Sequence, residues 1–383
     1  MTIHGLDLLT GMPVEVEADS HIRTVTVRPG SALPCLAPGF IDIQVNGYAG
    51  VDFSSPEISL DQIARSIRAL YATGVARFFP TVVTSSPADT LSALRKLAKA
   101  ANALPEGESI AGLHVEGPFI SAEDGPRGAH PLEWVRPADI DEYRRWKEAA
   151  GGLLRLITLA PECPGALALI ERIASDGLVA AIGHTAASAA QIDDAARAGA
   201  TLSTHLGNGA HASLPRHPNY IWDQLADDRL AASFIADGIH LPAAFLRTAF
   251  RAKGIDRSVL ITDSAAPAGC APGQYTLAGQ PVDLTADGRV TLAGQSRLAG
   301  SALRMDRAVE NAIRLGGVSV SAAIRMATCN PASVAHISAR DAGLAAGQYA
   351  DFVVLDYDPQ HQRIAVRETW LAGRRVFAAG VAA

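Results

Sequence analysis

Short β-branched runs alternate with longer amphipathic stretches through the middle of the chain, and this alternation constrains the fold more than any other feature. About eight runs have the length and composition of buried strands: residues 40–45, 77–83, 110–114, 154–159, 179–182, 201–204, 231–235 and 259–262. Helix-like stretches lie between them: residues 61–73, 87–102, 165–176, 188–198 and 243–252. Strands that alternate with helices form a parallel sheet, and eight such units close a barrel. We therefore predict an α/β protein with a (β/α)8 TIM-like barrel, since no Gly-x-Gly-x-x-Gly follows an early strand.

The two ends of the chain have a different texture. They carry short alternating strands separated by turn residues, as in residues 14–17, 24–27, 351–355 and 374–377. We expect residues 1–37 and 347–383 to combine into one small β-sandwich domain, and residues 38–346 to form the barrel domain. Residues 273–298, where Asp287-Gly288 separates strand-like runs, predict a hairpin inserted after the last barrel strand.

Composition excludes several classes of protein. The 383 residues are 48% hydrophobic and 19% charged, which is ordinary for a globular protein. The net charge of −6 argues against a nucleic-acid partner, and the longest apolar runs are too short to span a membrane. Four cysteines show no Cys-x-x-Cys pairing. The first residues show no cationic start leading into an apolar stretch, so we expect a cytoplasmic protein without a membrane partner.

Polar residues cluster at the predicted strand ends, where barrel enzymes carry their chemistry. The set comprises His114, Glu116, His184, His205, Asn208, Asp237, His240 and Asp263. Glu116, His184 and His205 together form a three-ligand set that leaves a position for water, as in catalytic zinc sites. Asp263 is placed to take a proton from that water and to deliver it to a leaving group. Each residue alone is equally explained as hydrogen-bonded structure or a helix cap, but their coincidence at one end of the barrel favours a metal site.

The first barrel strand reads IDIQVNG over residues 41–47. Many metal-dependent barrel hydrolases carry His-x-His at this place, and here Gln44 and Asn46 stand instead. Neutral amides are poor zinc ligands, so we expect one metal ion rather than two. Two roles remain open for these amides: hydrogen bonds to loop backbone, or indirect orientation of the bound water.

Nine stretches, in order along nearly the whole chain, carry a resemblance to a known family: PGFIDIQVNG, GLHVEGPFIS, GHTAAS, THLGN, FIADGIHLP, LITDSAAPAG, LAGSALRMDRAVEN, MATCNPA and GQYADFVVLD. The chain resembles the amidohydrolase superfamily and, within it, the N-acetylglucosamine-6-phosphate deacetylases. The resemblance implies deacetylation of N-acetyl-D-glucosamine 6-phosphate at one divalent metal ion, zinc, with iron or manganese as alternatives. It implies that Glu116, His184 and His205 hold this ion and that Asp263 is the catalytic aspartate.

The resemblance also implies a substrate site. His130 occupies the place of a histidine that contacts the substrate carbonyl, and His240 that of one contacting the sugar. We assign Asn208 and Gly117 to substrate binding as well. Arg216 is the nearest match to an arginine that holds the phosphate, often from the partner subunit, so we expect a homodimer.

The segment after the sixth strand, THLGNGAHASLPRHPNYIWDQL, departs from the family pattern. Gly207 replaces an aromatic residue and His211 is an added imidazole. Two alternatives therefore stay open. One is a related amidohydrolase acting on the galacto epimer or on an unphosphorylated acetamido sugar. The other is a barrel that binds an amino sugar without hydrolysing it.

Overall fold

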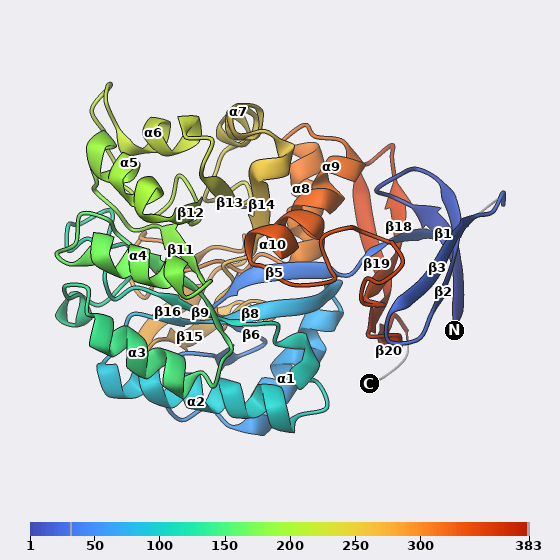
Figure 1. The fold of residues 1–383 in the computed structure, drawn as a ribbon, viewed down its shortest axis with the longest axis horizontal. Helices are drawn as coiled ribbons and strands as arrows, with labels where there is room; N and C mark the ends of the chain where they lie inside the picture. Colours follow the sequence, from blue (N-terminus) through green and yellow to red (C-terminus); the bar gives the residue numbers. More distant parts are fainter. Residues whose placement is uncertain (31–32, 381–383) are drawn as a thin grey trace.

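The computed structural model describes residues 1–30 and 33–380. Its centre is a parallel sheet in the order β14-β13-β12-β11-β10-β9-β8-β5. The strands are β5 (Phe40–Val45), β8 (Val75–Val83), β9 (Leu113–Glu116), β10 (Leu154–Leu159), β11 (Val179–Ile182), β12 (Ala200–Ser203), β13 (Ala231–Ile235) and β14 (Ser258–Ile261). The first and last strands meet through a parallel bridge between Val45 and Ser264. The sheet thus curls round on itself, and the predicted barrel is confirmed (Figure 1).

Backbone and side-chain hydrogen bonds join β5 to the end of β14. The amide of Asp263 donates to the carbonyl of Gln44 at 3.0 Å, and the amide of Asn46 donates to Ser264 at 2.8 Å. Beneath them, the buried Asp42 carboxylate accepts from the Thr262 hydroxyl at 2.6 Å. This junction places the two predicted amides of β5 directly beside Asp263.

Helices cover the outside of the barrel (Figure 1). They are α1 (Leu60–Tyr71), α2 (Pro87–Ala103), α3 (Ile140–Ala149), α4 (Ala166–Ser175), α5 (Ala189–Ala198), α6 (Tyr220–Ala226), α7 (Ala243–Lys253), α8 (Met305–Arg314), α9 (Val320–Met326) and α10 (Cys329–Val334), with 3-10 turns at Gly107–Ser109, Leu132–Trp134 and Ile255–Arg257. Capping boxes at Ser59 and Ser188 fix the starts of α1 and α5. The five predicted helices form, whereas α3, α6, α8, α9 and α10 were not predicted.

The third barrel strand lies further along the chain than predicted. Residues 110–114 were expected to form it, but β9 spans Leu113–Glu116, and Ile110 makes only an isolated bridge to Phe78. Gly112 packs where a Cβ atom would come within 2.8 Å of the Phe79 ring. As a result, Glu116 is part of the strand itself, and its carboxylate has a rigid support.

Both chain ends contribute to one separate sheet, at the right of Figure 1. Its strands are β1 (Thr2–Asp7), β2 (Pro13–Ala18), β3 (Ile22–Val27), β4 (Cys35–Pro38), β18 (Phe352–Asp358), β19 (Arg363–Leu371) and β20 (Arg374–Ala378). They follow the order β20-β19-β18-β4-β1-β2-β3. The predicted union of the two ends in a β domain is confirmed. The exact division at residues 37 and 346 stays a prediction.

A buried ion cluster joins this sheet to the barrel. Asp351, which precedes β18, pairs with Arg77 of β8 at 2.6 Å and with Arg340 at 3.3 Å. Burial alone would raise the pKa of Asp351, but the charges of Arg340 and Arg77 hold it below its usual value. The carboxylate is therefore ionised and compensated in the interior.

The predicted insertion after the last barrel strand is a three-stranded antiparallel sheet. It consists of β15 (Gly273–Leu277), β16 (Gln280–Leu284) and β17 (Val290–Leu292). Val282, Leu284, Val290 and Ala299 give it a small core of its own. Together with the short hairpin of β6 (Gly47–Tyr48) and β7 (Val51–Asp52), it lies at the barrel end where the strands carry their polar residues.

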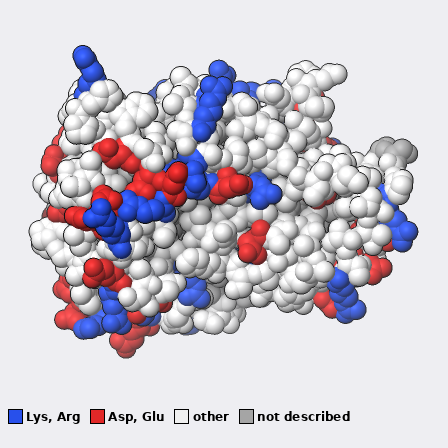
Figure 2. Space-filling view, turned by 45° about the horizontal axis from the view of Figure 1, so that its top comes forward, with Lys and Arg blue, Asp and Glu red and all other residues white. Residues whose placement is uncertain are grey.

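Two further features concern the apolar length of the helices and the distribution of charge on the surface. Among the described residues, no helix is both long and apolar enough to cross a membrane. Figure 2 shows acidic and basic side chains interspersed on the face in view.

Candidate active site

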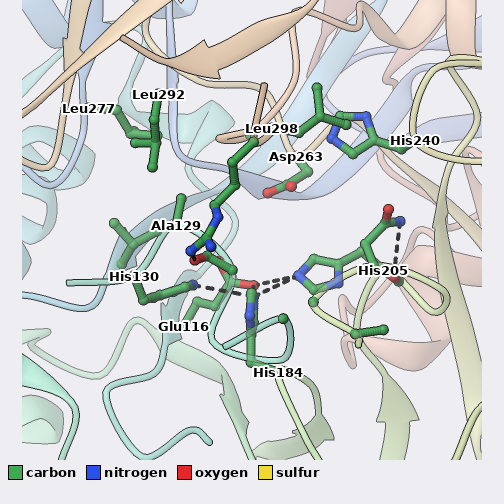
Figure 3. A pocket seen from close by; sticks show the side chains of 18 of the residues that line it. Glu116, Ala129, His130, His184, His205, His240, Asp263, Leu277, Leu292 and Leu298 are labelled. Atoms are coloured by element: carbon green, nitrogen blue, oxygen red, sulfur yellow. Dashed lines mark hydrogen bonds and ion pairs between the residues drawn. The ribbon is translucent and has the colours of Figure 1, made fainter. Parts of the chain in front are cut away.

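Four polar side chains from different strand ends converge above the barrel (Figure 3). The Glu116 Oε1 atom lies 2.9 Å from His205 Nε2 and 3.3 Å from His184 Nε2, and the two Nε2 atoms are 3.1 Å apart. Asp263 enters the same cavity from the end of β14. The structure thus brings together the residues that the sequence proposed as metal ligands and general base.

The backbone at this site is unusual. His184, His205 and Asp263 have positive φ values of 51°, 30° and 50°, in the left-handed region that residues with a Cβ atom seldom adopt. Each of these residues lies two positions beyond the last residue of a barrel strand. Such conformations tend to occur where function requires a particular side-chain direction, and here they turn three side chains into one cavity.

The donor set fits a divalent metal ion. His184 donates from Nδ1 to the Pro126 carbonyl at 2.8 Å, which leaves its Nε2 lone pair facing Glu116 and His205. Ligands of a tetrahedral ion at about 2.1 Å stand roughly 3.4 Å apart, close to the separations of these three atoms. The site holds two imidazoles and one carboxylate, which is the composition of an open catalytic centre.

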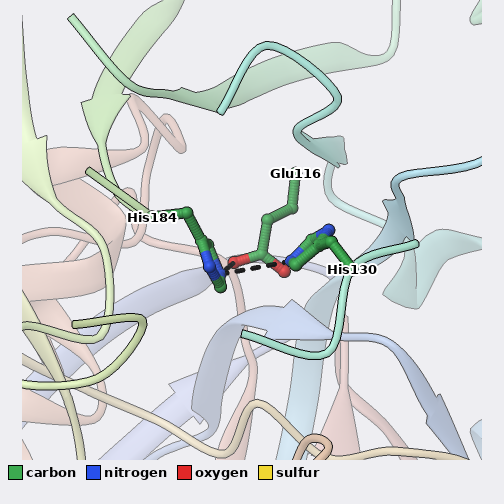
Figure 4. Close-up of side chains that lie close together, drawn as sticks. All are labelled: Glu116, His130 and His184. Carbon is green, nitrogen blue, oxygen red and sulfur yellow. Dashed lines mark hydrogen bonds and ion pairs between the residues drawn. The ribbon is translucent and has the colours of Figure 1, made fainter. Parts of the chain in front are cut away.

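His130 is a fourth member of the cluster. Its ligand atom lies within 4.8 Å of those of Glu116 and His184, so these three residues form a second geometrically possible ligand set (Figure 4). However, the Thr84 hydroxyl has two possible acceptors. His130 Nδ1 is 2.7 Å away, whereas the Glu116 carbonyl is at the long limit of 3.5 Å, so the hydroxyl donates to His130. A hydroxyl that donates to Nδ1 leaves the proton on Nε2, which suits a hydrogen-bond donor rather than a ligand.

Burial dominates the electrostatics of the site. It raises the pKa of Asp263 to about 6, and the nearby charge of Glu116 adds to this rise. Burial acts in the same direction on Glu116, but the neighbouring imidazoles of His184 and His205 bring its pKa well below the usual value. Burial and the neighbouring His184 lower the pKa of His130 to about 3, so this imidazole is neutral.

Gln44 and Asn46 bind the two carboxylates. Gln44 Nε2 donates to Glu116 Oε1 at 2.9 Å and to Asp263 Oδ1 at 3.1 Å. Asn46 Nδ2 donates to the same Asp263 oxygen at 2.7 Å. Amide nitrogens, which donate hydrogen bonds and do not bind a metal ion, therefore contact both carboxylates from β5.

A cavity of about 560 Å³ opens above this cluster. Of the residues predicted for the substrate, His130, His240 and Asn208 line it. His240 is held by Asp237, which accepts from its ring Nδ1 at 2.6 Å and from its backbone at 2.7 Å. This leaves His240 Nε2 free to meet a ligand.

Two other predicted residues do not line the cavity. Gly117 lies beneath it with φ at 71°, and a Cβ atom there would come within 2.2 Å of the Thr84 hydroxyl. Glycine is therefore required at this position because the packing leaves no room for a side chain. Arg216 lies exposed in the loop between β12 and α6.

The divergent loop after β12 is tied to the cavity rim by its added imidazole. His211 contacts the Tyr220 hydroxyl at 3.0 Å and Glu123 at 3.1 Å. Gly207 has φ at 98°, and a Cβ atom there would approach Leu241 to 2.8 Å, which accounts for glycine at this position.

Sequence reasoning missed several residues of this site. Thr84, which directly follows β8, was detectable by the same rule of polar strand ends. Three others were not detectable, because loops far apart in sequence bring Arg297 to the cavity and bring Glu123 and Tyr220 to the His211 side chain.

A barrel with this ligand set defines a metal-dependent hydrolase of the amidohydrolase class. The Amidohydrolase family model matches residues 35–378, so the chain belongs to that family. Within it, the chain belongs to the N-acetylglucosamine-6-phosphate deacetylases. It is 36% identical to the deacetylase of Danio rerio, over 89% of this chain and 84% of the relative. It is 35% identical to the Bacillus subtilis deacetylase, over 84% of this chain and 81% of the relative.

Solved structures show the same likeness. A mutant N-acetyl-D-glucosamine-6-phosphate deacetylase from Mycobacterium smegmatis, in complex with N-acetyl-D-glucosamine-6-phosphate, is 32% identical with a TM-score of 0.89, and 98% of this chain and 99% of that chain are covered. The Thermotoga maritima deacetylase is 27% identical with a TM-score of 0.86, at coverages of 98% and 99%.

Proposed function

We propose that the protein hydrolyses the acetamide of N-acetyl-D-glucosamine 6-phosphate to D-glucosamine 6-phosphate and acetate. The observation that carries the proposal is the convergence of Glu116, His184 and His205 beside Asp263 in one cavity. The names of the relatives supply the sugar phosphate.

Glu116, His184 and His205 would hold one divalent ion through Oε1 and two Nε2 atoms. When bound, such an ion supplies Lewis acidity, which acidifies water and polarises an amide carbonyl. We propose zinc; iron and manganese accept the same donors, and metal analysis of the purified protein distinguishes them.

The residues of the chain divide the proton transfers between them. Asp263 accepts the proton of the attacking water through the carboxylate that Asn46 and Gln44 hold in place. His130, with its proton on Nε2, donates a hydrogen bond to the oxygen that becomes negative on attack. Asp263 then delivers the proton to the departing amine, and His240 binds the sugar.

We also propose a cytoplasmic homodimer. Arg216 lies outside the cavity of its own chain and is exposed, so it is available to a second copy. Light scattering of the purified protein measures the oligomeric state.

The decisive experiment measures amine release from N-acetylglucosamine 6-phosphate, from its galacto epimer and from N-acetylglucosamine, with zinc-loaded protein of measured metal content. Preferred turnover of the gluco 6-phosphate with one ion per chain supports the proposal. Preference for another sugar would favour the alternative of a related amidohydrolase acting on another acetamido sugar. The altered loop around Gly207 and His211 is the observation that motivates this alternative. A filled site without turnover of any of the three would contradict the proposal.

A further inference from the structure

The loop of residues 121–130 packs against the ring of His184, one of the three proposed metal ligands. The Pro126 carbonyl accepts a hydrogen bond from His184 Nδ1 at 2.8 Å. A Cβ atom on Gly128 would lie 3.2 Å from the same ring. The loop ends at His130, whose Nε2 atom is 3.2 Å from His184 Nε2. The position of this loop therefore decides the direction in which the His184 ring presents Nε2.

The loop has little internal stiffness. Residues 121–130 form turns and bends, without a helix or strand. Their backbone hydrogen bonds are short-range, as from the Arg127 amide to the Glu123 carbonyl at 3.0 Å and from the Gly128 amide to the Gly125 carbonyl at 3.0 Å. Contacts of this kind shape each turn but do not fix the loop against the barrel. Its position depends on contacts from other parts of the chain.

Arg297 provides two such contacts from the insertion. Its own backbone is anchored there, because its carbonyl accepts from the Leu292 amide at 3.0 Å. Its Nη1 donates to the Gly128 carbonyl at 3.2 Å, and its Nη2 donates to Asp124 Oδ1 at 2.6 Å. One guanidinium thus bridges both ends of residues 124–128, and the Pro126 carbonyl lies between the two points that it holds.

Two further contacts hold the loop nearer its ends. Glu123 contacts His211 at 3.1 Å, and His130 contacts the Thr84 hydroxyl at 2.7 Å. These residues flank the segment 124–128 on either side. Arg297 therefore restrains the middle of the loop, which is the part that carries the hydrogen bond to His184.

The exposure of the Arg297 pair separates its effect on the site from its effect on stability. The side chains of Arg297 and Asp124 are 36% and 70% exposed, and ion pairs this exposed contribute little to the free energy of unfolding. A change at Arg297 should therefore leave the fold intact. Its consequence should lie in the loop geometry and in the ring that the loop orients.

We propose that Arg297 is a positioning residue for the metal site. By holding residues 124–128, it keeps the Pro126 carbonyl on His184 Nδ1 and the Nε2 lone pair directed toward Glu116. The inference rests on the proposed function for the presence of the metal ion. A carbonyl that binds Nδ1 fixes the tautomer and orientation of a ligating histidine, and loss of such a partner costs about 10- to 100-fold in metal affinity or activity.

The insertion thereby contributes to metal binding without supplying a ligand. Arg297 acts through the loop rather than on the imidazole, so the lower end of that range applies to its loss. The sign of the effect is also specific. Loss of a positive charge near the site would by itself favour binding of a cation, whereas loss of positioning weakens it.

The test measures zinc binding by the variants R297Q, R297K and R289Q. Arg289 is the matched control: it is an exposed arginine of the same insertion, paired with Asp287 at 2.9 Å, and it does not line the cavity. Competition with a chromophoric chelator gives the zinc Kd. The visible absorption of cobalt-loaded protein reports the geometry of the ligands, and thermal unfolding of the metal-free protein reports stability separately.

R297Q should raise the zinc Kd about 10-fold and alter the cobalt spectrum. The unfolding temperature of the metal-free variant should stay within about 2 °C of wild type, because the ion pair is exposed. R297K keeps the charge but loses the two-armed fork, so its zinc Kd should fall between those of wild type and R297Q. R289Q should match the wild-type protein in all three measurements.

Unchanged or tighter zinc binding by R297Q would overturn the inference. If the unfolding temperature of metal-free R297Q then fell, Arg297 would be a structural tie between the insertion and the barrel. An equal loss of zinc affinity in R289Q would also overturn it, since the effect would not depend on the contacts with Gly128 and Asp124.

Failure of the proposed function is distinguishable from failure of this inference. Wild-type protein that binds one zinc ion but releases no amine from the three sugars would refute the proposed function, and the zinc Kd of R297Q would still decide the role of Arg297. Wild-type protein that binds no zinc would refute the metal site and the positioning role together.

Discussion

Replacement of Asp263 by Asn separates its proposed role in proton transfer from its structural role. Both amide donors, Asn46 at 2.7 Å and Gln44 at 3.1 Å, contact the same oxygen, Oδ1. The amide oxygen of Asn can accept both hydrogen bonds, while its NH2 group replaces the second carboxylate oxygen and cannot take a proton. The variant should therefore fold and keep its metal.

The expected loss of rate follows from the proposed catalytic role of Asp263. General acid–base catalysis contributes about 100- to 10,000-fold, or roughly 3 to 5.5 kcal/mol of transition-state stabilisation. We expect kcat of Asp263→Asn to fall by that factor, with KM within about threefold of wild type because His240 and the cavity walls are unchanged. Asp287→Asn, a surface carboxylate in the insertion, is the matched control and should leave kcat unaltered.

The assay is steady-state amine release at saturating zinc, with metal content and thermal unfolding measured on the same samples. A kcat within threefold of wild type, at one ion per chain, would refute Asp263 as the proton-transfer group. Loss of bound metal together with loss of activity would show that Asp263 is needed for metal binding, and would refute a role in proton transfer alone.

Three other changes test the remaining parts of the structure. Asp351→Asn leaves Arg77 and Arg340 uncompensated and should lower the free energy of unfolding by about 3–5 kcal/mol in urea titrations. Because the pKa of Asp351 is depressed, this difference should be complete above about pH 4 and shrink as the pH falls through the folded-state pKa. Gly117→Ala should destabilise by about 1–3 kcal/mol, since its φ of 71° and the Thr84 hydroxyl leave no room for a Cβ atom; wild-type stability would contradict the packing argument. Removal of the metal by chelation should abolish amine release and lower the unfolding temperature, by an amount equivalent to about 2.7 kcal/mol for zinc at 100 times its Kd, and added zinc should reverse both.

Strands of this fold could be predicted from the sequence where a run of buried residues was the dominant local pattern. Buried β-branched runs predicted β5, β10, β11 and β13 with their observed bounds. Capping signals alone did not decide which helices were predicted: α8, whose Arg304 makes no side-chain cap bond, was missed, but so was α3, which Asp139 caps. The proposed ligands Glu116, His184 and His205 could be predicted because a barrel brings its strand ends together whatever the helices do. Arg297 could not, since its position depends on how the insertion folds back over the barrel.

The charge balance of the site supports the proposal of a single metal ion. Glu116 and Asp263 are buried near each other, and two ionised carboxylates in such a place need compensation. The Gln44 amide lies between them and donates to both, which supplies partial positive charge without a second ion. Asn46 adds another donor to Asp263 alone, so this carboxylate is held by amides, while Glu116 also faces two imidazoles. Under the proposed function, the two amides on β5 would thus distinguish a metal-binding carboxylate, Glu116, from a proton-transferring one, Asp263.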